Sequence, residues 1–512
     1  MSRIRSYFMI PLLLGLGLVP AGLAGCSGPS AGDPKEEGAE PLRITAMAYL
    51  MNAGNPSETL KQLIEEKTNT KLDIQWVLDS NYDEIMEASF AAGTLPQVVY
   101  IKNQVSFQQY RDAMKSGYFW EVGHLFKDYP NLSRLRPEIL QNTAVDGKVY
   151  SIYAEVPSSR QGIIYRKDWA DRLGLEAPAT VEDLYRMMKA FTENDPDGNG
   201  LPDTIGLADR SDLVFGAFKT VSSYFGTPNN WGMAENGLQP EFLFPGYRDT
   251  MDFFRRLYRE KLINRDFTIM SKNDQINLLL TGKAGMYIGS MEDVQTFSRK
   301  LAAHDPAAVL DVQNRIEGPR GTGVWGLPGY ISAVVFPKSS VKTEQELRAI
   351  LGFFDRLMEP EMANLITYGI EGTHYTLVEG KVLSSENRQL LEKEVIPYAT
   401  LLQRGSGHDT GIRDSYFTLP VRQKAARLVQ DNEAIVIQDP TAALDSKTFA
   451  EKGTRLADMI RDATYAYILE EGSGDAGFTE AVEKWRQEGG SSMIAEYNEA
   501  YREQQAGAQL SR

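Results

Sequence analysis

The sequence predicts an α/β protein with at least two packed lobes, and three observations support this. Short apolar segments with strand character alternate with amphipathic helical segments along most of the chain. The chain has 512 residues, which is too many for a single hydrophobic core. Its composition is that of an ordinary globular protein, with 42% hydrophobic and 24% charged residues, so no long disordered region is required.

The chain begins with a segment typical of a secretory signal. Arg3 and Arg5 precede an apolar run that closes on the small residues Ala24 and Gly25. A positive region, a short apolar core and a small-residue cleavage site define such a leader. Glycines and a proline also keep the core shorter than the roughly 20 apolar residues of a membrane-spanning helix. We therefore expect residues 1–25 to be removed.

Cys26 is the only cysteine of the chain and stands at the expected cleavage point. Residues 23–26, Leu-Ala-Gly-Cys, resemble the lipobox of bacterial lipoproteins, in which the cysteine thiol takes a diacylglyceryl group and becomes the new N-terminus. The alternative, an ordinary secretory signal, would leave an exported thiol without a disulfide partner. We expect lipidation at Cys26, because two acyl chains at about 0.8 kcal/mol per buried methylene give lasting attachment to the outer face of the cell membrane.

Residues 26–40 are polar and rich in small residues, so they are expected to form a flexible tether. The net charge of −15 argues against nucleic acid or an anionic membrane face as the main partner. With no possible intramolecular disulfide, the stability of this exported chain must come from large cores.

The first lobe is expected to begin near Leu42. Strands are predicted at 42–47, 72–77 and 98–101, and helices at 57–67 (capped by Ser57) and 83–92. This alternation implies right-handed crossovers and a mostly parallel sheet. Ligands of such sheets lie beyond the carboxyl ends of the strands, which makes three residues first-lobe candidates: Tyr49, Asp79 and Asn103.

A second set of strands and helices follows. Strands are predicted at 148–152, 162–165 and 284–288. Thr180 begins a helix as its cap, with Asp183 completing a capping box. The aromatic-rich region 211–245 is expected to form loops, and loops beside the end of a sheet often hold ligand.

Residues 194–203 have the oxygen alternation of a calcium loop. Gly200 provides the sharp turn at position 6, whereas Gly206 stands at position 12, where an EF-hand has its bidentate Glu. We expect a structural calcium ion, either completed by Asp203 and water or weakly held; the alternative is a polar turn after a helix. The expected ligands are the side chains or, at position 7, the backbone carbonyl of Asp195, Asp197, Asn199, Leu201 and Asp203.

The segment 321–326 matches a bare G-x-G-x-x-G pattern. A dinucleotide site needs a helix directly after it, and Pro328-Gly329 prevents one, so we interpret the segment as a loop leading to a strand at 331–336. The C-terminal part is predicted to be largely helical, over 345–358, 448–468 and 478–485, with a break at Gly489-Gly490.

Taken in order, several short motifs resemble the extracellular solute-binding proteins of bacterial ABC importers, specifically the large lipoprotein branch of the carbohydrate group (solute-binding protein family 1). Each motif is short, but the ordered set is specific. The chain departs from the family at Gln97, where Asp is common, at Tyr153, where Pro is common, and at Thr204, where alginate-binding relatives usually have Glu. The matching segments are 93–96, 146–150, 165–169, 195–203, 257–260, 368–375 and 485–501.

The resemblance implies the periplasmic-binding-protein type II fold, with two α/β lobes joined by a hinge of crossing segments. By analogy the chain crosses near 155–160, returns near 305 and crosses again near 376. The first lobe would then contain 41–156 and 306–375, and the second 157–305 and 376–505.

The resemblance also implies that the chain captures a sugar or oligosaccharide by hinge closure, as a monomer, and delivers it to the permease subunits of an ABC transporter. Sugar rings would lie on aromatic faces, and hydroxyls would bond to polar side chains. The candidate ligand-binding residues are Trp231, Trp325, Tyr224, Glu155, Arg160, Asp293 and Glu371.

Two other functions remain open from the residues. An extracellular glycoside hydrolase or lyase would need two carboxylates at a set separation, which 69 acidic residues do not exclude. However, the chain has no H-E-x-x-H or G-x-S-x-G motif, and its four histidines are scattered, so we expect no enzyme. A lipid-tethered sugar-sensing subunit would have the same fold.

Overall fold

The computed structural model describes residues 40–51, 55–401, 411–470 and 474–510. From Leu42 onward the chain forms one compact unit. The expected signal peptide, Cys26 and nearly all of the tether lie outside the described residues. Within those residues, no helix has the length and apolar character needed to cross a membrane.

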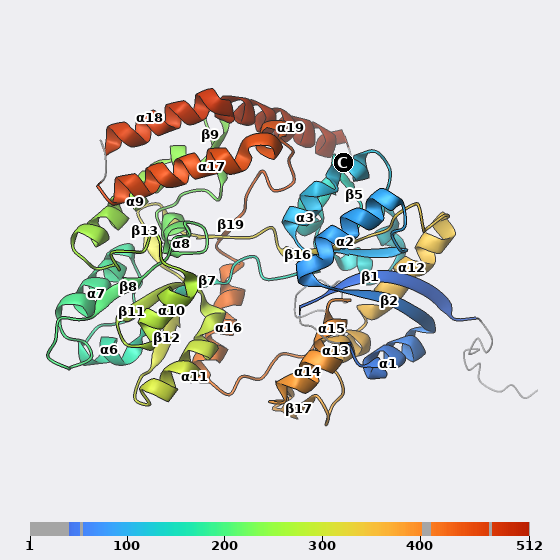
Figure 1. Ribbon diagram of the computed structural model, residues 1–512, viewed down its shortest axis with the longest axis horizontal. Helices are drawn as coiled ribbons and strands as arrows, with labels where there is room; N and C mark the ends of the chain where they lie inside the picture. Colours follow the sequence, from blue (N-terminus) through green and yellow to red (C-terminus); the bar gives the residue numbers. More distant parts are fainter. Residues whose placement is uncertain (1–39, 52–54, 402–410, 471–473, 511–512) are drawn as a thin grey trace, which may run out of the picture. The chain divides into compact units, whose positions relative to one another are not determined.

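The first sheet has five strands in the order β2-β1-β3-β16-β6 (Figure 1). β1 pairs in parallel with β2 and β3, whereas β16 runs antiparallel to both β3 and β6. The strands are β1 (Leu42–Leu50), β2 (Thr70–Leu78), β3 (Val98–Ile101), β6 (Ser151–Glu155) and β16 (Tyr330–Val335).

Helices from two separate parts of the chain pack with this sheet into one core, blue and orange in Figure 1. Ser57 accepts a hydrogen bond from the backbone of Thr59 and so caps α1, as predicted. The helices are α1 (Glu58–Thr68), α2 (Asp79–Ala92), α3 (Gln104–Gln109), α4 (Arg111–Lys115), α5 (Pro137–Asn142), α12 (Glu344–Leu357), α13 (Pro360–Tyr368), α14 (Arg388–Glu394) and α15 (Ile396–Ala399).

The second sheet has four strands in the order β12-β7-β11-β8. They are β7 (Gln161–Arg166), β8 (Ile205–Ala208), β11 (Ala284–Ser290) and β12 (Leu310–Gln313). The helices around it are α6 (Lys167–Arg172), α7 (Val181–Glu193), α8 (Ala217–Tyr224), α9 (Pro245–Arg259), α10 (Lys272–Leu280), α11 (Val294–His304) and α16 (Pro420–Asn432). Thr180 and Asp183 form the predicted capping box of α7.

Three C-terminal helices extend the second core, with α18 and α19 following α17 along the chain and packing on it (Figure 1). They are α17 (Lys447–Ile468), α18 (Asp475–Trp485) and α19 (Ser491–Leu510). The predicted break falls at Gly489, whose φ of 147° is outside the helical range.

Short strand pairs complete the fold. Two of these strands, β14 (Gly321–Thr322) and β15 (Val324–Trp325), lie in the glycine-rich segment, which therefore opens no helix, as predicted. β14 pairs with β13 (Glu317–Gly318), and β15 pairs with β19 (Val436–Ile437). The other pairs are β4 (Ala144–Val145) with β5 (Lys148–Val149), β9 (Trp231–Ala234) with β10 (Gly237–Pro240), and β17 (Tyr375–Val378) with β18 (Lys381–Ser384).

Both main sheets are mixed rather than mostly parallel. In the second sheet β7 runs antiparallel to both β11 and β12, and only the β11–β8 pair is parallel. The physical reason is that β7 and β16 enter their sheets from the other lobe. A strand that comes from the other lobe is not joined to its neighbour by a helical crossover within the same sheet. The rule that such crossovers give parallel neighbours therefore does not hold for it.

The strand pairing places two lobe boundaries later in the chain than expected. β12 pairs with β7, and its Leu310 and Val312 are buried in the second lobe, so the return to the first lobe begins after residue 313. Tyr398 is fully buried in the first core and donates a hydrogen bond to the Ser57 carbonyl at 2.5 Å. The chain therefore leaves the first lobe after residue 401 rather than near 376.

Candidate functional site

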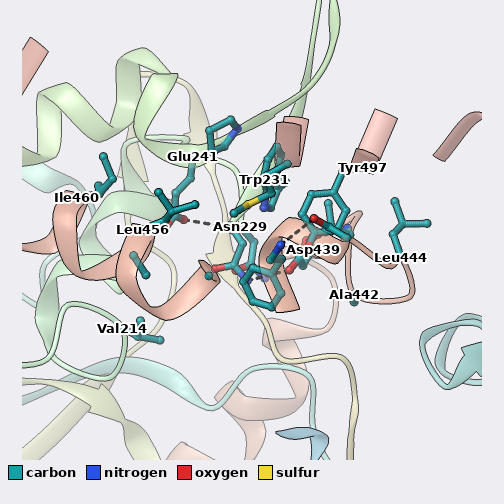
Figure 2. A pocket seen from close by; sticks show the side chains of 18 of the residues that line it. Val214, Asn229, Trp231, Glu241, Asp439, Ala442, Leu444, Leu456, Ile460 and Tyr497 are labelled. Carbon is teal, nitrogen blue, oxygen red and sulfur yellow. Dashed lines mark hydrogen bonds between the residues drawn. The ribbon is translucent and has the colours of Figure 1, made fainter. Parts of the chain in front are cut away.

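A cavity of about 1400 Å³ lies among residues that come from both lobes. Figure 2 shows lining residues of the second lobe. The first lobe contributes α4 and the end of α3, and the second contributes α8, α17 and the loops around β9. The segment 439–446, which leads into α17, forms a further part of the lining.

Trp231 and Trp325, both predicted from sequence, line this cavity. The Trp231 ring packs edge-on against Tyr497, with the ring centroids 4.8 Å apart. The Trp325 indole donates from Nε1 to Thr220 Oγ1 at 3.0 Å. Both side chains are largely buried, 7% and 3% exposed, so they act mainly as walls held in place by packing.

Phe449 presents an exposed aromatic face to the same cavity. It lies in the first turn of α17 and is 53% exposed. Large apolar side chains exposed inside a cavity are informative because packing does not account for them. The ring is thus available to a ligand, although the sequence pattern had assigned it only to a helix.

A polar cluster around the buried Lys219 lies beside the tryptophans. The Lys219 ammonium, 5% exposed, donates to Asn230 at 2.5 Å and to Glu241 at 2.9 Å, and it lies 5.7 Å from the Trp325 ring centroid. Asn230 in turn donates to Asp439 at 2.8 Å. Burial raises the pKa of Asp439 above its usual range, although hydrogen bonds from Asn230 and Thr441 oppose this. Figure 2 shows Glu241 and Asp439 near Trp231.

An ion-pair cluster connects α4 with the segment before α17. Arg111 and Lys115 each lie 2.6 Å from a carboxylate oxygen of Asp445. Partial burial raises the pKa of Asp445, but the charge of Arg111 and the hydrogen bond from Lys115 outweigh this and hold the pKa below its usual range. The lobes are thereby linked by a charged contact at the edge of the cavity.

A second, smaller cavity of about 240 Å³ adjoins the first, because Trp325 and Leu327 line both. It also contains two further predicted residues, Arg160 and Asp293. Asp293 accepts a hydrogen bond from the Tyr287 hydroxyl at 3.3 Å, and Arg160 lies 3.4 Å from Glu292.

Three predicted ligand-binding residues line neither cavity. Tyr224 is fully buried at the end of α8. Glu155 lies 3.1 Å from Arg136 inside the first lobe, and Glu371 is an exposed partner of Arg413 at 3.5 Å. The sequence placed all three in loops after strands or in glycine-rich connections, but Tyr224 ends the helix α8 and Glu155 ends the strand β6. The sequence pattern does not show on which side of its element such a residue points.

The loop predicted to bind calcium follows α7. The Asn199 amide donates to Asp197 at 2.8 Å and to Asp203 at 3.3 Å, and the backbone N–H groups of Asn199 and Gly200 donate to Asp195 at 3.0 Å. The acidic side chains therefore converge on one residue and offer only oxygen donors, which suits a hard cation. Over the described ranges, however, no group of three or more His, Cys, Asp or Glu is arranged to hold a metal.

Thr204 and Leu201 differ in their exposure to solvent in this loop. Thr204 is buried and donates to the Phe191 carbonyl at 2.8 Å, so its hydroxyl serves the end of α7. Leu201 is 57% exposed, and its backbone N–H donates to Asn199 at 2.7 Å. Asp203 also pairs with Lys283 at 2.6 Å.

Comparison with known proteins gives consistent matches. The family described as bacterial extracellular solute-binding protein matches residues 53–361. In Bacillus subtilis (strain 168), polygalacturonan/rhamnogalacturonan-binding protein YtcQ is 40% identical over 500 residues, covering 97% of this chain and 98% of that protein. Lipoprotein LipO of the same organism is 31% identical over 499 residues, covering 95% and 97%.

A solved structure from Bifidobacterium longum infantis confirms the expected type II fold. It is described as an HMO-binding, ABC-transporter-associated solute-binding protein and matches with a TM-score of 0.69 at 15% identity. The match covers 90% of this chain and 99% of that one. At this identity the likeness concerns the fold.

Proposed function

This chain belongs to the bacterial extracellular solute-binding proteins, and we propose that it captures an acidic oligosaccharide in the cavity lined by both lobes. The relative YtcQ is named as a binder of polygalacturonan and rhamnogalacturonan, whose chains carry galacturonate. Hinge closure would populate the bound state because the ligand contacts both lobes only in that form.

The observation that carries this proposal is the main cavity itself. At about 1400 Å³ it exceeds the roughly 300–1,000 Å³ of sites for small ligands, so it suits several sugar units. It combines an exposed ring, Phe449, with polar groups held in fixed positions, among them Lys219 and Asp439. Aromatic faces for rings and fixed polar groups for hydroxyls are what an oligosaccharide requires.

Calorimetric titration with oligogalacturonates of two to six units tests the proposal. We expect binding without turnover, with the ligand recovered intact by chromatography. Cleavage of the ligand would favour the hydrolase or lyase, and absence of binding to acidic and neutral oligosaccharides alike would contradict the proposal.

Phe449→Ala provides a matched test of the cavity. Because the ring is 53% exposed, its loss should leave folding nearly unchanged but raise Kd about tenfold, which corresponds to about 1.4 kcal/mol. Ile269→Ala is the control, since Ile269 is 83% exposed and lines neither cavity. Equal affinities of the two variants would show that Phe449 does not contact the sugar.

We further propose that the protein works at the outer face of the cell membrane, held by lipid on Cys26, and passes its ligand as a monomer to an ABC permease. The lipobox-like residues 23–26 and the name of the relative LipO support the anchor. Cys26→Ser should release the protein into the medium, and continued retention of that variant would argue for another anchor. The molar mass of the released protein, measured by light scattering, tests whether it is a monomer.

The loop after α7 is proposed as a structural calcium site. The side chains of Asp195, Asp197, Asn199 and Asp203 and the Leu201 carbonyl would hold the ion, which would neutralise carboxylates that otherwise repel one another. Asp197→Ala should abolish the rise in melting temperature on adding calcium. Glu176→Ala, an exposed carboxylate outside the loop, is the control and should keep it. An unchanged melting temperature of the wild type in chelator would contradict the site.

A further inference from the structure

We propose that the small cavity is a subsite for one uronate unit of the bound oligosaccharide, with the sugar carboxylate facing Arg160 and Lys272 and the ring against Phe215. This inference rests on the proposed function and names the part of the site that recognises acidic ligands. A volume of about 240 Å³ equals about eight water molecules of ~30 Å³, which is the scale of a single sugar unit.

The charges of the two cavities differ in sign. Five cationic and seven acidic side chains line the large cavity. Three cationic side chains, Arg160, Arg210 and Lys272, and a single acidic one, Asp293, line the small cavity. The chain as a whole carries −15, so the small cavity is a basic position in an acidic protein. A ligand carboxylate is therefore favoured in the small cavity over the large one.

The cations of the small cavity differ in how far they are already neutralised. Arg210 is 7% exposed and donates to Gln275 and to the Phe215 carbonyl, so its role is to stabilise the residues that line the cavity. Arg160 shares a single carboxylate, Glu292, with Arg422. Lys272 is exposed and has no carboxylate partner in the described part of the chain. Lys272 and Arg160 are thus the groups with charge left for a ligand.

Phe215 supplies the surface for the ring. Its side chain is 47% exposed, and its position is fixed by a hydrogen bond from its backbone N–H to Asp212 and by the bond from Arg210 to its carbonyl. The Phe215 and Trp325 rings meet edge-on, with centroids 5.6 Å apart. Because Trp325 lines both cavities, a ligand chain in the large cavity can place its terminal unit on Phe215.

Asp293 gives the small cavity a negatively charged acceptor in addition to its cations. Its carboxylate already accepts from Tyr287 and has further acceptor capacity for sugar hydroxyls. A uronate offers both a carboxylate for the cations and hydroxyl donors for Asp293, whereas a neutral sugar offers only the hydroxyls. The arrangement therefore distinguishes acidic from neutral units.

Titration calorimetry with trigalacturonate and with its fully methyl-esterified, uncharged form tests the subsite. The wild type should bind the acid at least tenfold more tightly than the ester, and this preference should weaken with added salt. Lys272→Gln should raise Kd for the acid about tenfold and leave Kd for the ester unchanged. Lys300→Gln is the control, because it removes one exposed lysine charge from the same lobe outside both cavities.

The outcomes separate this inference from the proposed function. If the wild type binds acid and ester equally, or if Lys272→Gln and Lys300→Gln behave alike, the uronate subsite is overturned while oligosaccharide capture stands. If only neutral oligosaccharides bind, the subsite is overturned together with the acidic ligand of the proposed function, and only capture of a sugar stands. If no oligosaccharide binds, the proposed function fails, and the subsite fails with it. Arg160→Gln combined with Lys272→Gln should remove the preference for the acid altogether.

Discussion

The carboxyl group of Asp209 lies buried at the start of α8, with the residue 2% exposed. It accepts a hydrogen bond from the Ala217 backbone at 2.9 Å, and the backbone N–H of Asp209 donates to Asn264 at 2.8 Å. Burial raises the pKa of Asp209 to about 7, although the hydrogen bond from Ala217 and the charge of Arg210 oppose this. The protonation of this group therefore couples folding to pH near neutrality.

Asp209→Asn should flatten the dependence of stability on pH. An unfolded aspartate has a pKa of about 3.9, so between that pH and about 7 the folded wild type binds more protons than the unfolded chain. Its free energy of unfolding should accordingly fall as pH rises through this window, by on the order of 4 kcal/mol at most. Calorimetric melting of both proteins at pH 4.5, 6 and 8 measures the difference, and parallel profiles would contradict the assignment.

The aromatic side chains show which parts of the site can be predicted from the sequence. Trp231 and Trp325 were predicted from their loop positions and do line the main cavity, but both are nearly buried. The exposed rings, Phe215 and Phe449, were not selected because a phenylalanine in a helix or beside one is usually packed. The exposure of a side chain depends on neighbours that are distant in sequence, so it cannot be predicted from the sequence alone.

At the scale of elements, the capping box of α7 was predicted from sequence, and its contribution to the free energy of unfolding can be measured. Thr180 Oγ1 accepts from the Asp183 backbone at 3.1 Å, and Asp183 accepts from the Thr180 backbone at 3.0 Å. The helix buries Leu184 and Phe191 in the second core and ends at the acidic loop. Loss of the cap would loosen the start of a helix that supports this loop.

Thr180→Ala should destabilise the second lobe by about 1 kcal/mol, because the first turn loses its side-chain acceptor. For a lobe of this size the melting temperature should fall by about 2 °C. Thr180→Ser keeps the acceptor oxygen and should retain most of the stability. Scanning calorimetry compares the three proteins, and equal losses for alanine and serine would mean that the Thr180 methyl group, not the cap, matters.

Local signals predicted the elements better than their pairing. The strand at 98–101 and the cap at Ser57 appear where expected because both depend on residues close in the chain. The direction of β16 and the place of β12 were missed because they depend on how the chain crosses between lobes. Asp445 was missed for the same reason, since its partner Arg111 is 334 positions earlier in the chain.

At the scale of the whole molecule, the end of α16 connects the crossing segments. Asn432 donates to the Ser159 carbonyl at 3.1 Å and accepts from Asn314 at 3.0 Å, so one residue contacts the first and second crossings. Glu433 accepts from the Ser158 backbone at 2.7 Å and lies 3.6 Å from Arg136 of the first lobe. These bonds fix the segments about which closure would occur.

Glu433→Ala should weaken ligand binding without removing any group that lines either cavity. Loss of the carboxylate frees the first crossing and adds open conformations, and the apparent Kd rises as the fraction of closure-competent molecules falls. We expect an increase of about three- to tenfold for acidic and neutral ligands alike, measured by calorimetry against Glu499→Ala, an exposed carboxylate on α19. This equal effect contrasts with Lys272→Gln, which should affect only the acid. A loss confined to acidic ligands would show that Glu433 acts on the small cavity through Ser158 rather than on the hinge.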